Sequence, residues 1–290
     1  MDLLDVTYAN VATMDAGHGQ VAYPPSALGV TYTAATLTAQ PKARVIGFGA
    51  SHGSNVQPTF NNVWAQGPGI MLDPMGGGLY RMQDPFIGAD TPAAGPAGAI
   101  LTRMCINYYT SGGTAPILAS LLNLSSTPTT DWAPDGPLHY KLLVALKRFQ
   151  DLGQTTGFDC DPNLLIFAYG PNELNNPPLW ANAMNRLVAD LRARHVMPKA
   201  RLGLVLNAAC GQQDQACPPV DNGGTTDASV YARMIFLLKQ IEWLQQNPED
   251  CFAIWLKDVL PPALYTGDVC HLNDRGASLV AGHAAGFLER

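Results

Sequence analysis

Short apolar runs recur along most of the chain, and each is followed by a turn and then by a segment of different character. A run of five or six residues suits a strand that is buried on both faces. Strands that alternate with amphipathic helices are typical of a parallel sheet covered by helices on both faces. We therefore expect an α/β protein with a doubly wound, flavodoxin-like, five-stranded parallel sheet. The five runs are RVIGFG (44–49), MCINYY (104–109), LLIFA (164–168), LGLVLN (202–207) and FAIWL (252–256).

The segments between these runs carry apolar residues at helical spacing. Such a spacing places the apolar side chains on one face of a helix, which then packs against the sheet. Proline is favoured in the first turn of a helix, so Pro137 and the pair Pro177 and Pro178 indicate where two of these helices begin. The predicted stripes are Leu138, Leu142, Leu146 and Phe149; Leu179, Ala183, Leu187 and Leu191; Met234, Leu238 and Ile241 on a helix over 227–246; and Leu279, Val280 and Phe287 on a last helix.

Two stretches lack any such period. Residues 1–43 alternate Tyr, Val, Ala and Thr with Gly and Pro, which predicts an irregular, extended N-terminal arm packed on the main domain. Residues 61–100 are rich in Gly, Pro and Met and indicate a long loop, which is often functional in a compact domain. The expected organisation is one arm, 1–43, and one domain, 44–290.

Charge and hydropathy exclude several classes of partner. The net charge is −6 without a run of Lys or Arg, so a protein that binds nucleic acid by neutralising phosphates is not expected. No segment reaches the roughly 18 consecutive apolar residues that cross a bilayer, and the first residues do not resemble a signal peptide. Only 14% of the residues are charged, which favours an extracellular or virion-associated protein. The oligomeric state stays open.

The six cysteines show neither a CxxC pair nor another metal-type spacing. We therefore expect no metal site, and nothing in the sequence indicates a cofactor. Cys210 and Cys217 bracket a short polar loop, so they either form a disulfide or remain two thiols.

A serine, a histidine and an aspartate follow predicted strands in an arrangement that suits nucleophilic catalysis. Ser51 lies between Gly49 and Gly53 directly after the first run, where small neighbours allow a tight turn and an exposed hydroxyl. Asp268 and His271 lie three residues apart after the last run, so one turn can bring the carboxylate to the imidazole. Attack on an ester needs such a hydroxyl, a neutral imidazole and a carboxylate that orients it.

Other histidines are weaker candidates for the base. His52 follows Ser51, but the side chains of neighbouring residues after a strand point apart. The remaining histidines have no carboxylate at a motif spacing and are expected on the surface or in packing roles: His18, His139, His195 and His283.

The order of these residues resembles that of the SGNH (GDSL-like) hydrolase superfamily. Four blocks carry the resemblance: GASHG at 49–53, SGGT at 111–114, GPNE at 170–173 and DxxH at 268–271. Within the superfamily the chain looks most like the sialate O-acetylesterase and acetylxylan esterase branch, through GGT at 112–114, Asp131-Trp132 and HLNDRG at 271–276.

The resemblance implies a role for each matching residue. Ser51 would be the nucleophile, with His271 as base and Asp268 as its partner. The oxyanion would be held by the Ser51 and Gly112 backbones and by the Asn172 side chain, with Gly113 as the rival of Gly112.

The resemblance also implies an activity. The expected reaction is removal of an acetyl or other short acyl group from a carbohydrate such as a bacterial surface polysaccharide. Two alternatives remain: a lipase or thioesterase of the same superfamily, and a non-catalytic glycan-binding or virion structural protein.

Overall fold

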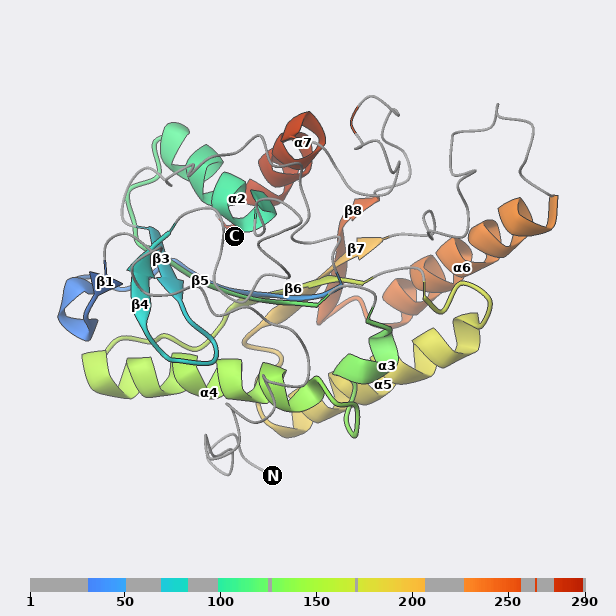
Figure 1. The fold of residues 1–290 in the computed structure, drawn as a ribbon, viewed down its shortest axis with the longest axis horizontal. Helices are drawn as coiled ribbons and strands as arrows, with labels where there is room; N and C mark the ends of the chain where they lie inside the picture. The colour runs from blue at the N-terminus through green and yellow to red at the C-terminus, as the bar shows by residue number, and fades with distance from the viewer. Residues whose placement is uncertain are drawn as a thin grey trace.

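The protein is described by a computed structural model over residues 31–50, 69–82, 99–124, 127–169, 172–206, 227–256, 264 and 274–288. Strands and helices alternate along these residues (Figure 1). The strands are β1 (Thr31–Tyr32), β2 (Ala43–Gly49), β3 (Gly69–Leu72), β4 (Leu79–Arg81), β5 (Ile117–Asn123), β6 (Leu164–Ala168), β7 (Arg201–Leu206) and β8 (Cys251–Leu256). The helices are the short η3 (Ala34–Thr36) and α3 (Thr129–Trp132), and the longer α2 (Ala99–Thr110), α4 (His139–Thr156), α5 (Pro177–Ala193), α6 (Asp227–Gln246) and α7 (Asp274–Ala285).

The described strands form one sheet of eight, in the order β1-β4-β3-β5-β2-β6-β7-β8. All neighbours from β3 to β8 are parallel, whereas β4 is antiparallel to β3 and β1 is antiparallel to β4. The α/β class is therefore confirmed, but the expected five-stranded, fully parallel sheet is corrected to a mixed sheet of eight strands. Within it, β5-β2-β6-β7-β8 has the 2-1-3-4-5 order of a flavodoxin-like sheet.

Helices cover both faces of the sheet, and two apolar cores result. In Figure 1, α4 and α5 lie below the sheet and α2 and α7 lie above it. Helix α6 contributes Phe236 and Trp243 to the same core as α4 and α5. Alternate residues of each strand serve the two cores, as in β2, where Ile46 and Phe48 face α4 and Val45 faces α2. The strands are buried on both faces, which is why they appear in the sequence as unbroken apolar runs.

Four of the five predicted strands are confirmed, but MCINYY is helical. Its residues lie in α2, which packs against α7 above the sheet. Tyr, Ile and Cys favour strands, and this composition concealed a helical spacing in which Leu101, Met104, Cys105 and Tyr108 are all buried. The strand that lies beside β2, on the side away from β6, is instead β5 (ILASLLN). It was not predicted, because a run of leucines does not distinguish a strand from a helix.

The predicted loop over 61–100 contains two strands. In β3 and β4 the chain forms a hairpin, closed by a backbone hydrogen bond of 2.8 Å from Asp73 N to Gly78 O. The Asp73 carboxylate accepts the backbone N–H groups of Met75 and Gly76, both at 2.9 Å, as aspartates do in turns. Strands of four and three residues are too short to be recognised by periodicity.

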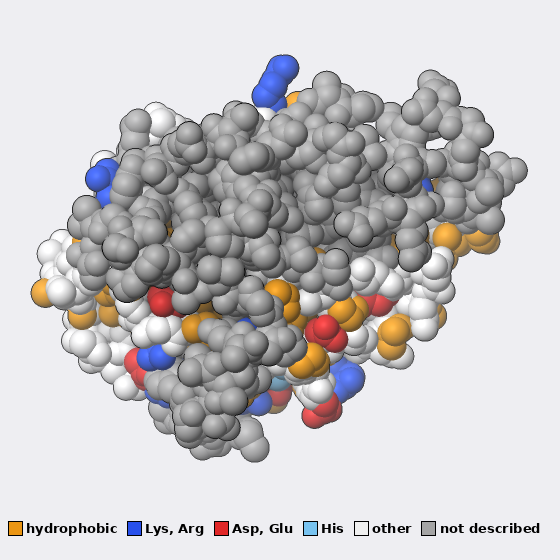
Figure 2. Space-filling view, viewed as in Figure 1, with side chains coloured by type: hydrophobic (Ala, Val, Ile, Leu, Met, Phe, Trp, Pro, Cys, Tyr) orange, Lys and Arg blue, Asp and Glu red, His pale blue; other side chains and the backbone are white. Residues whose placement is uncertain are grey.

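The helices over 139–156, 177–193 and 227–246 agree with the predicted positions, but α6 turns a different face to the core. Met234 and Leu238 are 58% and 51% exposed, whereas Phe236 and Trp243 are buried. The predicted stripe therefore points outward over most of its length. Figure 2 shows hydrophobic side chains at the surface in the region of α6.

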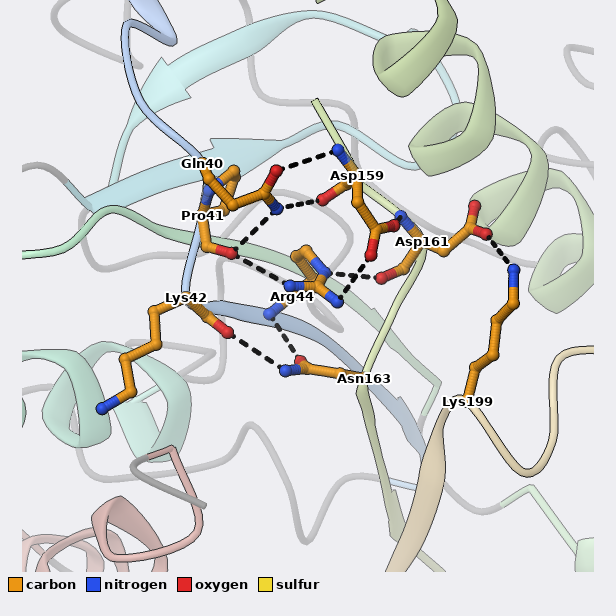
Figure 3. A network of polar contacts seen from close by, with 8 residues as sticks. All are labelled: Gln40, Pro41, Lys42, Arg44, Asp159, Asp161, Asn163 and Lys199. Carbon is orange, nitrogen blue, oxygen red and sulfur yellow. Dashed lines mark hydrogen bonds and ion pairs between the residues drawn. The ribbon is translucent and has the colours of Figure 1, made fainter. Parts of the chain in front are cut away.

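At the edge where the parallel strands begin, Arg44 connects β2 to the segment that leads into β6 (Figure 3). Its guanidinium donates to the carbonyls of Asp161 at 2.7 Å and Pro41 at 3.0 Å. Asn163 completes the connection, because its amide accepts from Arg44 N at 2.8 Å and donates to Lys42 O at 3.1 Å. Side chains thus satisfy backbone groups that precede the sheet ladder.

Three cysteines lie among the described residues, and Cys105, Cys160 and Cys251 are buried free thiols. Cys210 and Cys217 lie outside the described residues. None of the described helices is both long enough and apolar enough to cross a bilayer.

Candidate functional site

The carboxyl ends of β2, β5 and β6 meet at one edge of the sheet. The chain leaves β2 toward β5 on one side, while β6 lies on the other side, so this is the point where the strand order reverses. Ala50 N donates to Ala168 O at 2.8 Å, and Leu124 N donates to Gly49 O at 2.9 Å. Open α/β sheets bind their ligands beyond such a switch point, which makes this edge the candidate site.

Gly49 ends β2 in a conformation that excludes a side chain. Its φ is +124°, and a Cβ added there would lie 2.4 Å from Ala168 O. Only glycine combines that backbone angle with so close an approach to β6. The first glycine of GASHG therefore allows the end of β2 to approach β6 closely, directly before Ala50 and Ser51.

Asn172 lies after β6, at the same edge as Ala50. It belongs to the turn before α5, and its side chain is exposed. Asn172 thus follows the strand that neighbours β2.

Glu173, next to Asn172, is buried and holds the start of α3. Its carboxylate accepts the backbone N–H and the hydroxyl of Thr129. Burial raises the pKa of Glu173, although N–H donors from Thr129 and Thr130 oppose that effect. In the sequence, Glu173 is recognisable only as the last residue of GPNE, and its contact with Thr129 could not be predicted because Thr129 is 44 residues away.

Gly112 and Gly113 lie at the opposite edge of the sheet, which corrects the role expected of them. They connect α2 to the start of β5, about 20 Å from its far end for a seven-residue strand. Gly112 N donates to Tyr109 O at 3.1 Å, and Gly113 N donates to Tyr108 O at 3.0 Å. With φ +93°, Gly112 ends a helix, and neither glycine reaches the edge at which Ala50 lies. Gly112 would have lain at the carboxyl end of a strand if residues 104–109 were extended, but these residues are helical.

Three predicted catalytic residues lie outside the described residues: Ser51, Asp268 and His271. Ser51 directly follows Ala50, and the Asp268/His271 pair belongs to the connection between β8 and α7. The rival base His52 also lies outside the described residues.

His139 has the packing role expected of it, and its carboxylate partner lies 51 residues away in the sequence. Its Nε2 lies 3.0 Å from Asp190 Oδ2, and its Nδ1 lies 2.9 Å from Trp132 O. Arg194 donates to the same Asp190 oxygen at 2.6 Å. Both ring nitrogens are occupied in a buried position, so His139 has none left for a serine hydroxyl and acts in packing α4 against α5.

The fold and the strand ends define a doubly wound α/β protein with a candidate site at the switch point. No protein-family model matches the sequence, and no curated protein is significantly similar to it. A solved structure of a protein from Arabidopsis thaliana is similar with a TM-score of 0.59 at 14% identity, over 85% of this chain and 98% of the plant protein. That likeness shows a shared fold.

Two further solved structures are more distant. LAE5, an alpha/beta hydrolase enzyme from the metagenome of Lake Arreo, Spain, has a TM-score of 0.42 at 11% identity, over 87% of this chain and 99% of its own. A peptidoglycan O-acetylesterase has a TM-score of 0.38 at 12% identity, over 88% of this chain and 93% of its own. Neither likeness is close enough to carry an argument about activity.

Proposed function

We propose that the chain is a serine esterase that removes short acyl groups, above all acetyl, from carbohydrate. The observation that carries the proposal is the hydrogen bond between Ala50 and Ala168 at the switch point. It joins the residue before Ser51 to the strand whose exit leads to the exposed Asn172. A nucleophile and an oxyanion donor would then share one edge of the sheet.

The reaction proceeds in two steps and needs no cofactor. His271, oriented by Asp268, takes the proton of the Ser51 hydroxyl as its oxygen attacks the ester carbonyl. The sugar hydroxyl leaves with that proton, and water then hydrolyses the acyl-enzyme to release acetate. The Ser51 N–H and the Asn172 amide stabilise the oxyanion. In place of Gly112, the second backbone donor comes from the segment that follows β5, because that strand lies beside β2.

A fluorophosphonate probe followed by peptide mapping tests the nucleophile. We expect the label on Ser51, its loss in Ser51→Ala and its retention in Ser54→Ala, the matched control in the same segment. In p-nitrophenyl acetate hydrolysis, Ser51→Ala and His271→Ala should leave almost no activity. Asn172→Ala should retain a measurable residue, because loss of one oxyanion donor costs roughly 10²–10³-fold in rate. A label on another serine contradicts the assignment.

The acyl and sugar preferences are tested separately. We expect p-nitrophenyl acetate to be hydrolysed faster than the decanoate, and acetate to be released from acetylated polysaccharide. A preference for the long chain would instead favour a lipase or thioesterase. Absence of both labelling and acetate release would favour a non-catalytic glycan-binding or virion protein.

A further inference from the structure

Asn123 is a buried polar residue at the carboxyl end of β5. It follows Ile117, Ala119 and Leu121 on the face of the strand that α2 and α7 cover, and its side chain is 0% exposed. Its Nδ2 donates to Ala50 O at 2.8 Å, across to the end of β2. Burying an amide in an apolar layer costs free energy unless the amide is hydrogen-bonded. The bond to Ala50 O therefore offsets part of the cost of burying Asn123.

Among the described residues, the other end of the Asn123 amide has no hydrogen-bond partner. Its Oδ1 is buried without a hydrogen bond in the part of the chain that the structure describes. Asn123 lines a cavity of about 20 Å³ whose other lining residues are glycine or apolar. A buried carbonyl oxygen without a donor opposes folding, so the side chain is not optimised for stability alone.

The bond to Ala50 acts on a peptide unit that the proposed reaction uses. The carbonyl of Ala50 and the N–H of Ser51 belong to the same planar unit and point in opposite directions when the bond is trans. A donor that fixes the carbonyl therefore also fixes the direction of that N–H. A hydrogen bond to a carbonyl also polarises the unit and strengthens its N–H as a donor, by about 10–30% in condensed-phase estimates.

Two further hydrogen bonds hold the same end of β2. Ala50 N donates to Ala168 O at 2.8 Å, and Gly49 O accepts from Leu124 N at 2.9 Å. These two backbone bonds fix the Gly49–Ala50 peptide unit. Among the described residues, the Asn123 side chain alone donates to the next carbonyl, that of Ala50.

We propose that Asn123 is a positioning residue that orients and polarises the Ala50–Ser51 peptide unit for oxyanion binding. The inference rests on the proposed function, in which Ser51 supplies the nucleophile and one oxyanion donor. Asn123 acts through Ala50 and does not touch substrate. Its loss should therefore lower the rate of the chemical step more than it weakens substrate binding.

The matched control is Ser120, another polar residue of β5 that is 0% exposed. Its hydroxyl donates to Leu72 O at 2.9 Å, a buried side-chain-to-carbonyl bond directed at β3 instead of β2. Ser120→Ala therefore removes the same kind of contact from the same strand, away from Ala50.

The experiment compares Asn123→Ala, Asn123→Leu, Ser120→Ala and wild type in p-nitrophenyl acetate hydrolysis, fluorophosphonate labelling and thermal unfolding. We expect both Asn123 variants to lose about tenfold or more in kcat and in labelling rate, with KM within about threefold. Ser120→Ala should keep kcat within about twofold while its melting temperature falls. Asn123→Leu keeps nearly the same side-chain size but has no donor, and it maintains the test if the alanine variant fails to fold.

Two failures are distinguishable. If wild type is labelled at Ser51 and a folded Asn123 variant keeps kcat within twofold of Ser120→Ala, the positioning role is wrong and the esterase stands. If wild type neither labels at Ser51 nor hydrolyses the ester, the proposed function itself is wrong.

Discussion

Glu173 is a carboxyl group whose ionisation is coupled to folding. It lies in a buried position between the candidate site and the start of α3, where it accepts from Thr129. Its pKa lies above the ordinary value of 4.5, first because burial penalises the charge. A carboxyl group with a raised pKa in the folded state binds a proton more readily there than in the unfolded chain. Its protonation therefore stabilises the fold below the ordinary pKa, and this contribution is lost as the pH rises through the folded-state pKa.

Glu173→Gln should remove that pH dependence. The amide oxygen can still accept from Thr129 N, but the residue is neutral at every pH. We expect the free energy of unfolding of wild type, relative to Glu173→Gln, to fall as the pH is raised from about 4 to about 8. Urea denaturation at several pH values measures this difference, with Glu249→Gln as an exposed-glutamate control. A difference that rises with pH would contradict the raised pKa.

The position of helix α6 was predicted correctly, but the face that it buries was not. Its bounds match the sequence analysis, but apolar side chains occur nearly all round it. Phe236 and Trp243 pack against Trp180 of α5, with ring centroids 5.9 and 5.7 Å apart. Tyr231, Met234, Ile235 and Leu238 form a second stripe that remains exposed. The spacing alone cannot show which of the two apolar stripes is buried, because that depends on how α6 packs against α5.

Substitutions in α6 should therefore separate its two faces. Phe236→Ala should destabilise the protein by about 3–5 kcal/mol, since it leaves a cavity beside Trp180. Leu238→Gln should change the free energy of unfolding by less than about 0.5 kcal/mol, because the side chain is exposed. Chemical denaturation of the two variants measures both values. A larger cost for Leu238→Gln would mean that the outer stripe is covered.

The whole sheet depends on contacts between distant parts of the chain, of which the Arg44 contacts are one case (Figure 3). The contacts with Asp161 and Asp159 join the start of β2 to residues more than 100 positions away. Most of the guanidinium bonds go to backbone carbonyls, while its ion pair at 3.3 Å is with Asp159, whose side chain is 63% exposed. An exposed ion pair contributes little, whereas unpaired carbonyls are costly.

Arg44→Lys should therefore cost more than Asp159→Asn. Lysine keeps the charge but cannot donate to several carbonyls in the plane of a guanidinium. We expect a loss of about 1–3 kcal/mol for Arg44→Lys and less than about 1 kcal/mol for Asp159→Asn. Guanidinium denaturation of both variants gives the comparison. The reverse order would show that the ion pair, not the carbonyl contacts, stabilises this edge.

The sequence by itself determined the elements whose signals are local. Unbroken apolar runs predicted β2, β6, β7 and β8, and the prolines before Leu179 predicted the start of α5. The alternation of these elements predicted the α/β class and the edge at which Ala50 and Asn172 lie.

Only the tertiary structure decided the features that depend on distant partners. Residues 104–109 became a helix because α7 packs against them, and β5 became the neighbour of β2 through seven paired residues. Because residues 104–109 are helical and residues 117–123 form the strand, Gly112 lies at the opposite edge of the sheet from Ala50, and Asn123 lies beside Ala50. The physical reason is that periodicity within a segment specifies which face of it is apolar, whereas burial, strand order and buried polar contacts are set by residues far away in the chain.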